Sequence, residues 1–182
     1  MHLPTHLILS WLVGHRLQNR RDRVIVAWAG VAPDLDALTA LAGIEVYGTW
    51  HHVLTHGITA VVVLTALWTW LARSKLPVAA LSALTFHLHL VCDLLGSGVQ
   101  WGIKYLYPFS SAEIFTPYGW SLASWQNVAI TVVGMTAAGW IGVRRGRTFA
   151  ETFLPAAGEA AVVEALQRRF VRNPTARPVV RP

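Results

Sequence analysis

The chain is short of charge and has almost no cysteine. Only 13 % of its 182 residues are Asp, Glu, Lys or Arg and 54 % are hydrophobic, whereas about a quarter of the residues in an average soluble domain are charged. This composition excludes a disordered chain, a coiled coil and a collagen-like chain. The single cysteine, Cys92, excludes a disulfide scaffold. The length allows one domain with a sizeable core.

Basic residues are scarce in the middle of the chain. The formal net charge is +6, but of 15 Lys and Arg only Arg73, Lys75 and Lys104 lie between residues 24 and 143. A nucleic-acid-binding face needs basic residues spread over a folded surface. We therefore expect no nucleic-acid partner. An apolar block flanked by basic clusters instead predicts a membrane protein whose partner is lipid.

The apolar segments predict an all-α, polytopic membrane protein with about five hydrophobic helices. A membrane-spanning helix needs about 20 apolar residues. The segments expected to span are residues 57–72, lengthened by residues 53–56, residues 77–95 and residues 122–143. Two further segments, residues 3–14 and 24–44, are shorter or interrupted, and they either span or form a re-entrant pair.

The composition changes near residue 147. We expect residues 1–147 to form the membrane-embedded helical domain and residues 148–182 to form a tail. Within the tail, residues 155–171 predict a short amphipathic helix, since apolar residues recur at helical spacing before a basic end. Residues 173–182 are rich in Pro and Arg, and we expect them to be disordered.

Three basic clusters set the expected orientation. They are residues 16–23, 73–75 and 144–147, and cytoplasmic loops collect such charge. Alternating passes place all three clusters, and the C-terminal tail, in the cytoplasm. The aromatic-rich residues 96–121 then lie on the outer face, beside the lipid headgroups.

Histidines and aspartates stand in or beside the apolar segments, and all eight histidines lie between positions 2 and 89. Ionisable groups at membrane depth are costly unless paired or ligated, so they are functional candidates. His52 and His56 are four residues apart, as are His89 and Asp93, which on a helix places each pair on one face. His87 falls on nearly the opposite face, where we expect it either to pack or to support a ligand from behind. The candidate metal ligands are His6, Asp34, Asp36, His51, His56, His89 and Asp93.

These residue types indicate a particular chemistry. Neutral imidazole and carboxylate suit zinc, manganese or iron, and one cysteine excludes a thiolate site. We expect one or two divalent ions, with zinc preferred. Such an ion lowers the pKa of bound water toward about 7, and two ions about 4 Å apart are usual in phosphoester hydrolysis. Asp34 and Asp36 are the expected catalytic carboxylates. The chain has no G-x-S-x-G motif, so serine catalysis has no support.

The order of these motifs resembles a known family. The sequence contains His6, Pro33-Asp34-Leu35-Asp36, His51-x4-His56 and His89-x3-Asp93, followed by Gly98 and Tyr107-Pro108-Phe109. Over about residues 1–145 this order resembles the YdjM-type family of bacterial inner-membrane, metal-dependent hydrolases. It is more distantly similar to zinc-dependent phospholipase C and nuclease P1.

The resemblance implies a helical, multi-pass protein of the bacterial inner membrane with a His/Asp metal centre. The orientation set by the basic clusters places that centre toward the extracytoplasmic face. The ligands that the resemblance implies are His6, Asp34 or Asp36, His51 or His56, His89 and Asp93. The chain departs from the family at His51-His52-Val53, where the family usually has His-Arg-Gly, so an arginine that could hold a phosphate is missing.

The leading hypothesis is a membrane-bound metal-dependent hydrolase that acts on a small-molecule or lipid phosphoester. The alternative is a membrane protein with a structural metal site and an interaction or remodelling role, because ligands look alike in both cases. A transporter is the third hypothesis, since intramembrane Asp and His also build relays. It is disfavoured because residues 122–143 offer only Gln126 and Asn127, near one end, beyond Ser, Thr and Gly.

Overall fold

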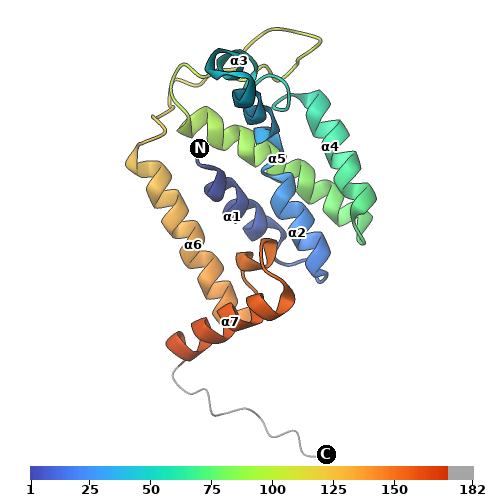
Figure 1. Ribbon diagram of the computed structural model, residues 1–182, viewed down its shortest axis with the longest axis vertical. Helices are drawn as coiled ribbons and strands as arrows, with labels where there is room; N and C mark the ends of the chain where they lie inside the picture. Colours follow the sequence, from blue (N-terminus) through green and yellow to red (C-terminus); the bar gives the residue numbers. More distant parts are fainter. Residues whose placement is uncertain (172–182) are drawn as a thin grey trace, which may run out of the picture. The chain divides into compact units, whose positions relative to one another are not determined.

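The computed structural model describes residues 1–171, and the regular elements in this range are helices apart from one isolated bridge between Ile103 and Ile114. The all-helical class expected from the sequence is therefore confirmed. The expected disordered end at residues 173–182 lies outside the described residues. The helices (Figure 1) are α1 Leu3–Gly14, α2 Arg20–Ala29, η1 Ala32–Ala42, α3 Ile44–Trp50, α4 Ile58–Leu71, α5 Lys75–Gly96, α6 Trp125–Arg145, η2 Phe149–Thr152 and α7 Ala156–Phe170, with η marking 3-10 helices.

Two helices in the described part of the chain are long and apolar enough to cross a membrane, α5 and α6. At 22 residues α5 is about 33 Å long, which matches a hydrocarbon core of about 30 Å. Two of the three expected spans therefore have the required length. Helices α2 and η1 pass the same test only as a pair bent by 52°, which is either a broken span or a re-entrant loop.

The remaining expected span is shorter than the sequence indicated. Helix α4 has 14 residues, about 21 Å, and begins only at Ile58. The backbone at His52 has a φ of 67°, in the left-handed region that no helix interior adopts. Residues 51–57 form turns and bends, so the expected helical start at residue 53 is wrong.

The chain forms two compact units, Met1–Gly134 and Met135–Pro182. In the first unit α1, α2, α4 and α5 pack side by side (Figure 1). One apolar cluster centres on Phe86 of α5 and Val61 of α4, and another on Val26 of α2 and Val78 of α5. Helix α5 belongs to both clusters, so it is held against α2 and against α4.

One glycine allows the closest approach in this unit. A Cβ atom built at Gly30, the residue after α2, would lie 1.8 Å from Ser10 Oγ of α1 and 3.1 Å from Thr85 Cβ of α5. No side chain fits there. The absence of one lets the end of α2 lie directly against α5, one turn before His89.

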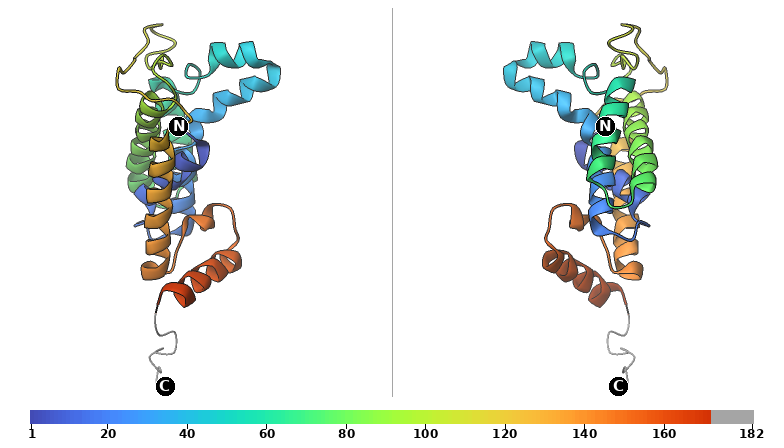
Figure 2. Two further views of the ribbon diagram at one scale, coloured as in Figure 1. Left: turned by 90° about the vertical axis from the view of Figure 1, so that its left-hand side faces the viewer. Right: turned by 90° about the vertical axis from the view of Figure 1, so that its right-hand side faces the viewer.

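Helices η1 and α3 form an arm, residues 32–50, that projects sideways from the packed helices of the first unit (Figure 2). The two helices pack on each other, and η1 touches α2 and α5 at its base. Asp34 and Asp36 lie at this base, within the first five residues of η1.

The second unit contains the last part of α6, η2 and α7. The Glu159 carboxylate on α7 accepts a hydrogen bond from the Thr148 backbone N–H at 3.1 Å. Gln167 donates a hydrogen bond to the Val143 carbonyl at 3.3 Å. Helix α7 occupies the segment expected to form the short C-terminal helix.

Candidate metal centre

Four side chains from three separate segments converge in the first unit. They are Asp34 of η1, His56 of the turn before α4, and His89 and Asp93 of α5, and each offers one ligand atom within 4.8 Å of the others. His56, His89 and Asp93 are at most 2 % exposed, and Asp34 is half-buried. All four were expected to be ligands.

Asp93 lies at the middle of the cluster. Its Oδ2 atom is 2.8 Å from His89 Nε2, 3.5 Å from His56 Nε2 and 3.7 Å from His52 Nε2. Its Oδ1 atom is 3.2 Å from His6 Nε2 and also accepts hydrogen bonds from the Ser97 hydroxyl and the Met1 amino group. The expected pairing of His89 with Asp93, one turn apart on a helix, is present.

Hydrogen bonds on the far side of two imidazoles fix how they point. His56 Nδ1 donates to Asp36 Oδ2 at 2.9 Å, and His89 Nδ1 donates to the Gly30 carbonyl at 2.8 Å. With Nδ1 as the donor, the Nε2 lone pair of each neutral ring faces the cluster. This is how metal-bound histidines are commonly oriented.

Three of the atoms that face the cluster have no hydrogen-bond partner. His56 Nε2, His89 Nε2 and Asp93 Oδ2 are buried and form no hydrogen bond. Asp93 Oδ2 nevertheless lies only 2.8 Å from His89 Nε2 and 3.5 Å from His56 Nε2. A buried unpaired polar group costs about 1–3 kcal/mol. A cation removes that cost for all three at once, so the residues present fit a divalent metal ion.

Asp36 lies behind the cluster, where its oxygens are already occupied. Oδ1 is 2.6 Å from His51 Nδ1, and Oδ2 accepts from His56 Nδ1 and, at 3.3 Å, from the Thr55 backbone N–H. Asp36 is thus not among the groups that offer a ligand atom, and Asp34 is. The sequence left open which of the two carboxylates faces the ion.

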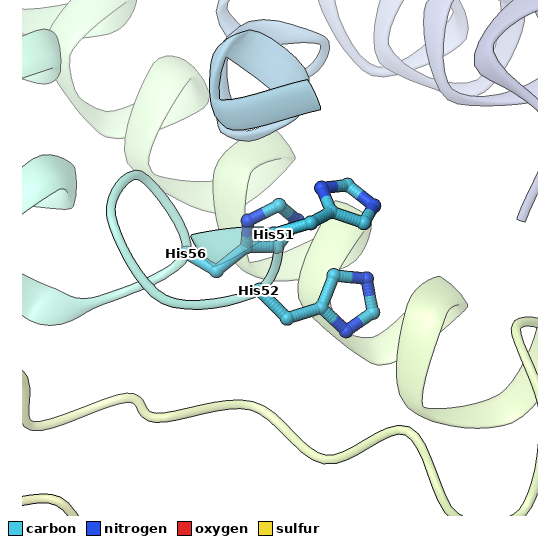
Figure 3. Close-up of side chains that lie close together, drawn as sticks. All are labelled: His51, His52 and His56. Atoms are coloured by element: carbon cyan, nitrogen blue, oxygen red, sulfur yellow. The ribbon is translucent and has the colours of Figure 1, made fainter. Parts of the chain in front are cut away.

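His51, His52 and His56 form a second group of ligand atoms within 4.8 Å, all on one short turn (Figure 3). His52 and His56 were expected on one face of a helix, and this is wrong because both residues lie in a turn. Burial lowers the pKa of His52 to about 3, so its ring is neutral at pH 7 and can act as a ligand. His52 was not among the expected ligands.

The remaining histidine of α5 lies outside the cluster. His87 Nδ1 lies 2.7 Å from the Ala83 carbonyl and its Nε2 lies 2.9 Å from the Tyr105 hydroxyl. Both of its nitrogens are therefore engaged away from His89, as expected from its position two residues along the helix.

Two hollows adjoin the cluster. A cavity of about 70 Å³ has Asp34, His52, Asp93, Tyr47, Trp101 and Leu122 among its lining residues. A larger pocket of about 370 Å³ shares His51 and Trp101 with it and contains Lys104, whose ammonium lies 3.4 Å from Glu113.

A buried His and carboxylate cluster at the end of a helix that can span a bilayer defines a helical membrane protein with a candidate metal centre. The chain belongs to the family described as YdjM inner membrane protein, which it matches over residues 1–170. It is therefore an inner membrane protein. The comparisons with curated proteins and with solved structures find no match.

Proposed function

We propose that this protein is a membrane-bound, metal-dependent hydrolase of phosphoesters. The observation that supports it is the convergence of three buried, unpaired ligand atoms, His56 Nε2, His89 Nε2 and Asp93 Oδ2, next to the half-buried Asp34. Zinc fits this donor set, which has imidazole and carboxylate but no thiolate. When bound, such an ion supplies Lewis acidity and a water of lowered pKa.

The side chains divide into holding, orienting and proton-accepting roles. His56, His89 and Asp93 hold the ion. Asp36 orients His56 through Nδ1, and the Gly30 carbonyl orients His89 in the same way. Asp34, which lines the small cavity, accepts the proton of the attacking water. His51 and His52 offer the place for a second ion.

The distribution of charge supports the expected orientation of the first unit. Arg73 and Ser74, just before α5, donate backbone hydrogen bonds to Asp22, so the basic residues of 20–23 and 73–75 gather at one end of α5. The metal centre lies near the other end of this helix. Since basic loops stay in the cytoplasm, the centre faces the extracytoplasmic side.

Metal-dependent hydrolysis tests this proposal. Protein purified in detergent is stripped with a chelator, reloaded with zinc or manganese, and assayed on a panel of phosphomonoesters and phosphodiesters. We expect hydrolysis by the reloaded protein, loss of hydrolysis with Asp34→Asn, and no loss with His87→Ala. Hydrolysis that is equal in stripped and reloaded protein would contradict the proposal.

A structural metal site is the second candidate, favoured by how deeply His56, His89 and Asp93 are buried. An ion there would tie α5 to the turn before α4, with an interaction or remodelling role for the protein. Stoichiometric metal without hydrolysis of any member of the panel would favour this second candidate.

A further inference from the structure

The arm formed by η1 and α3 exposes large aliphatic side chains. Leu38 is 62 % exposed, Leu41 is 89 % exposed and Ile44 is 77 % exposed. Residues 32–50 contain no Lys or Arg, and their only charged side chains are Asp34, Asp36 and Glu45. The surface of a soluble protein seldom exposes so many aliphatic side chains close together.

The arm lies level with one end of a candidate membrane span. Asp93 is three residues from Gly96, the last residue of α5, so the cluster lies about 5 Å from that end. Asp34, at the base of the arm, belongs to the same cluster. The arm therefore leaves the packed helices of the first unit close to where α5 would leave the hydrocarbon core, and it points sideways (Figure 2).

Aromatic residues mark the same level. Asn127, near the start of α6, donates a hydrogen bond to the carbonyl of Gly96 at 2.9 Å, so the start of α6 lies beside the end of α5. Trp120 donates its indole N–H to Asn127, and Trp125 is exposed at the first position of α6. Tryptophans gather at the interface between lipid and water.

We propose that the arm lies in the headgroup layer with its aliphatic side chains in the lipid, and that the substrate is a membrane phospholipid whose phosphate reaches the centre from the bilayer. The substrate assignment rests on the proposed function. A lipid bilayer covers the aliphatic side chains of the arm. The membrane spans place a bilayer at the level of the arm, and apolar helices that lie parallel to the membrane plane sit in the headgroup layer.

The hollows beside the centre match such a ligand. Tyr47 of α3 and Trp101 form the aromatic wall of the small cavity, and Leu122 adds an apolar surface. The adjoining pocket is polar and contains Lys104, a cation that can attract a phosphate in place of its present ion-pair partner, Glu113. An amphiphile can thus place its headgroup in the pocket while its chains remain beside the arm.

Fluorescence quenching tests the position of the arm. In a Cys92→Ala background, Leu41→Cys and the matched control Glu45→Cys are labelled with an environment-sensitive fluorophore and reconstituted in phospholipid nanodiscs. We expect nitroxide lipids labelled near the headgroup to quench the label at position 41, and aqueous iodide to quench the label at position 45. Quenching of position 41 by iodide, or protection from both quenchers by a second copy, overturns the proposal.

Vesicle assays test the substrate. We expect Leu38→Asp with Leu41→Asp to lower hydrolysis of a vesicle-borne phospholipid by about tenfold or more, because charge expels the arm from the headgroup layer. Hydrolysis of soluble bis(p-nitrophenyl) phosphate and the metal content should stay unchanged, and Leu38→Met with Leu41→Met should retain both activities.

The other outcomes separate the two proposals. Equal loss on both substrates, or no loss on either, overturns the lipid assignment. Wild-type protein that hydrolyses neither substrate overturns the proposed function and the substrate assignment together, whereas the position of the arm is then decided by the quenching experiment alone.

Discussion

The two ends of α5 each have a buried carboxylate beside them, and the two carboxylates differ in what surrounds them. Asp22, near the start of α5, accepts hydrogen bonds from the backbone N–H groups of Arg73 and Ser74 at 2.8 and 2.9 Å. Asp93, near the end, has an oxygen that faces three imidazole Nε2 atoms within 3.7 Å and has no hydrogen-bond partner.

This difference separates a structural carboxylate from a candidate ligand. Asp22 is 0 % exposed and Asp93 is 2 % exposed, so burial alone does not distinguish them. Asp22 completes the hydrogen bonding of the turn that leads into α5. Around Asp93, by contrast, Oδ2 and the Nε2 atoms of His56 and His89 have no hydrogen-bond partner, and a bound cation would satisfy all three.

The largest expected effect is the loss of metal-dependent stability at the Asp93 end. Because a ligand stabilises the fold by an amount that grows with its free concentration, zinc at about 100 times its Kd should add about 2.7 kcal/mol to wild-type protein. Asp93→Asn and His89→Ala should lose this gain. Melting curves in detergent, with zinc and with a chelator, measure it.

His87→Ala is the matched control for this prediction, since His87 lies on the same helix and bonds away from the cluster. It should keep the zinc-dependent rise in melting temperature. Loss of that rise in His87→Ala to the same extent as in His89→Ala would contradict the assignment.

A smaller effect is expected for Asp36, which acts on the centre through His56. Removing a carboxylate that orients a metal-bound histidine lowers metal affinity by about 10–100-fold. Asp36→Asn should therefore weaken zinc binding without abolishing it, as measured by competition with a chromophoric chelator. An affinity equal to that of wild type would show that the hydrogen bond to His56 does not orient a ligand.

Gly30→Ala should disturb the packing that sets the position of His89. The added Cβ would meet Ser10 Oγ at 1.8 Å, and overpacking of this kind costs about 1–3 kcal/mol. Adding Ser10→Gly should recover part of the loss in melting temperature. If the double variant is no more stable than Gly30→Ala alone, the contact with Ser10 is not the cause.

The smallest effect on the metal is expected at the Asp22 end. Asp22→Ala removes the acceptor of two backbone N–H groups, and an unsatisfied buried donor costs about 1–3 kcal/mol. The melting temperature should fall, while the rise on adding zinc should equal that of wild type. A zinc response as weak as that of Asp93→Asn would remove the distinction between the two ends.

The sequence predicted the helical class because long apolar segments bounded by basic residues are a strong signal. It also named His6, Asp34, His56, His89 and Asp93, which the fold brings together; their role as ligands stays a prediction. It could not tell which of Asp34 and Asp36 faces the cluster. The two residues point to different sides of a tight helix, and the sequence does not show which side is turned inward.

Other features were beyond the reach of the sequence. The turns of residues 51–57 delay the start of the expected helix to Ile58. Within them, His52 has a left-handed backbone, and its Nε2 lies 3.7 Å from Asp93 Oδ2. The Gly30 carbonyl that orients His89 is a backbone group, which no residue type indicates. Trp101, in the loop after α5, and Tyr47, in the arm, line the same cavity with their ring centroids 6.0 Å apart, a tertiary contact between distant segments that no motif indicates.

The metal content of the purified protein tests the central claim most directly. Protein prepared without nickel affinity steps and analysed by plasma mass spectrometry should contain about one zinc or similar divalent ion per chain when wild type, and about the same with Asp22→Ala. Asp93→Asn should contain almost none. Wild-type protein without stoichiometric metal, or Asp93→Asn with as much as wild type, would contradict the claim that the cluster is a metal centre.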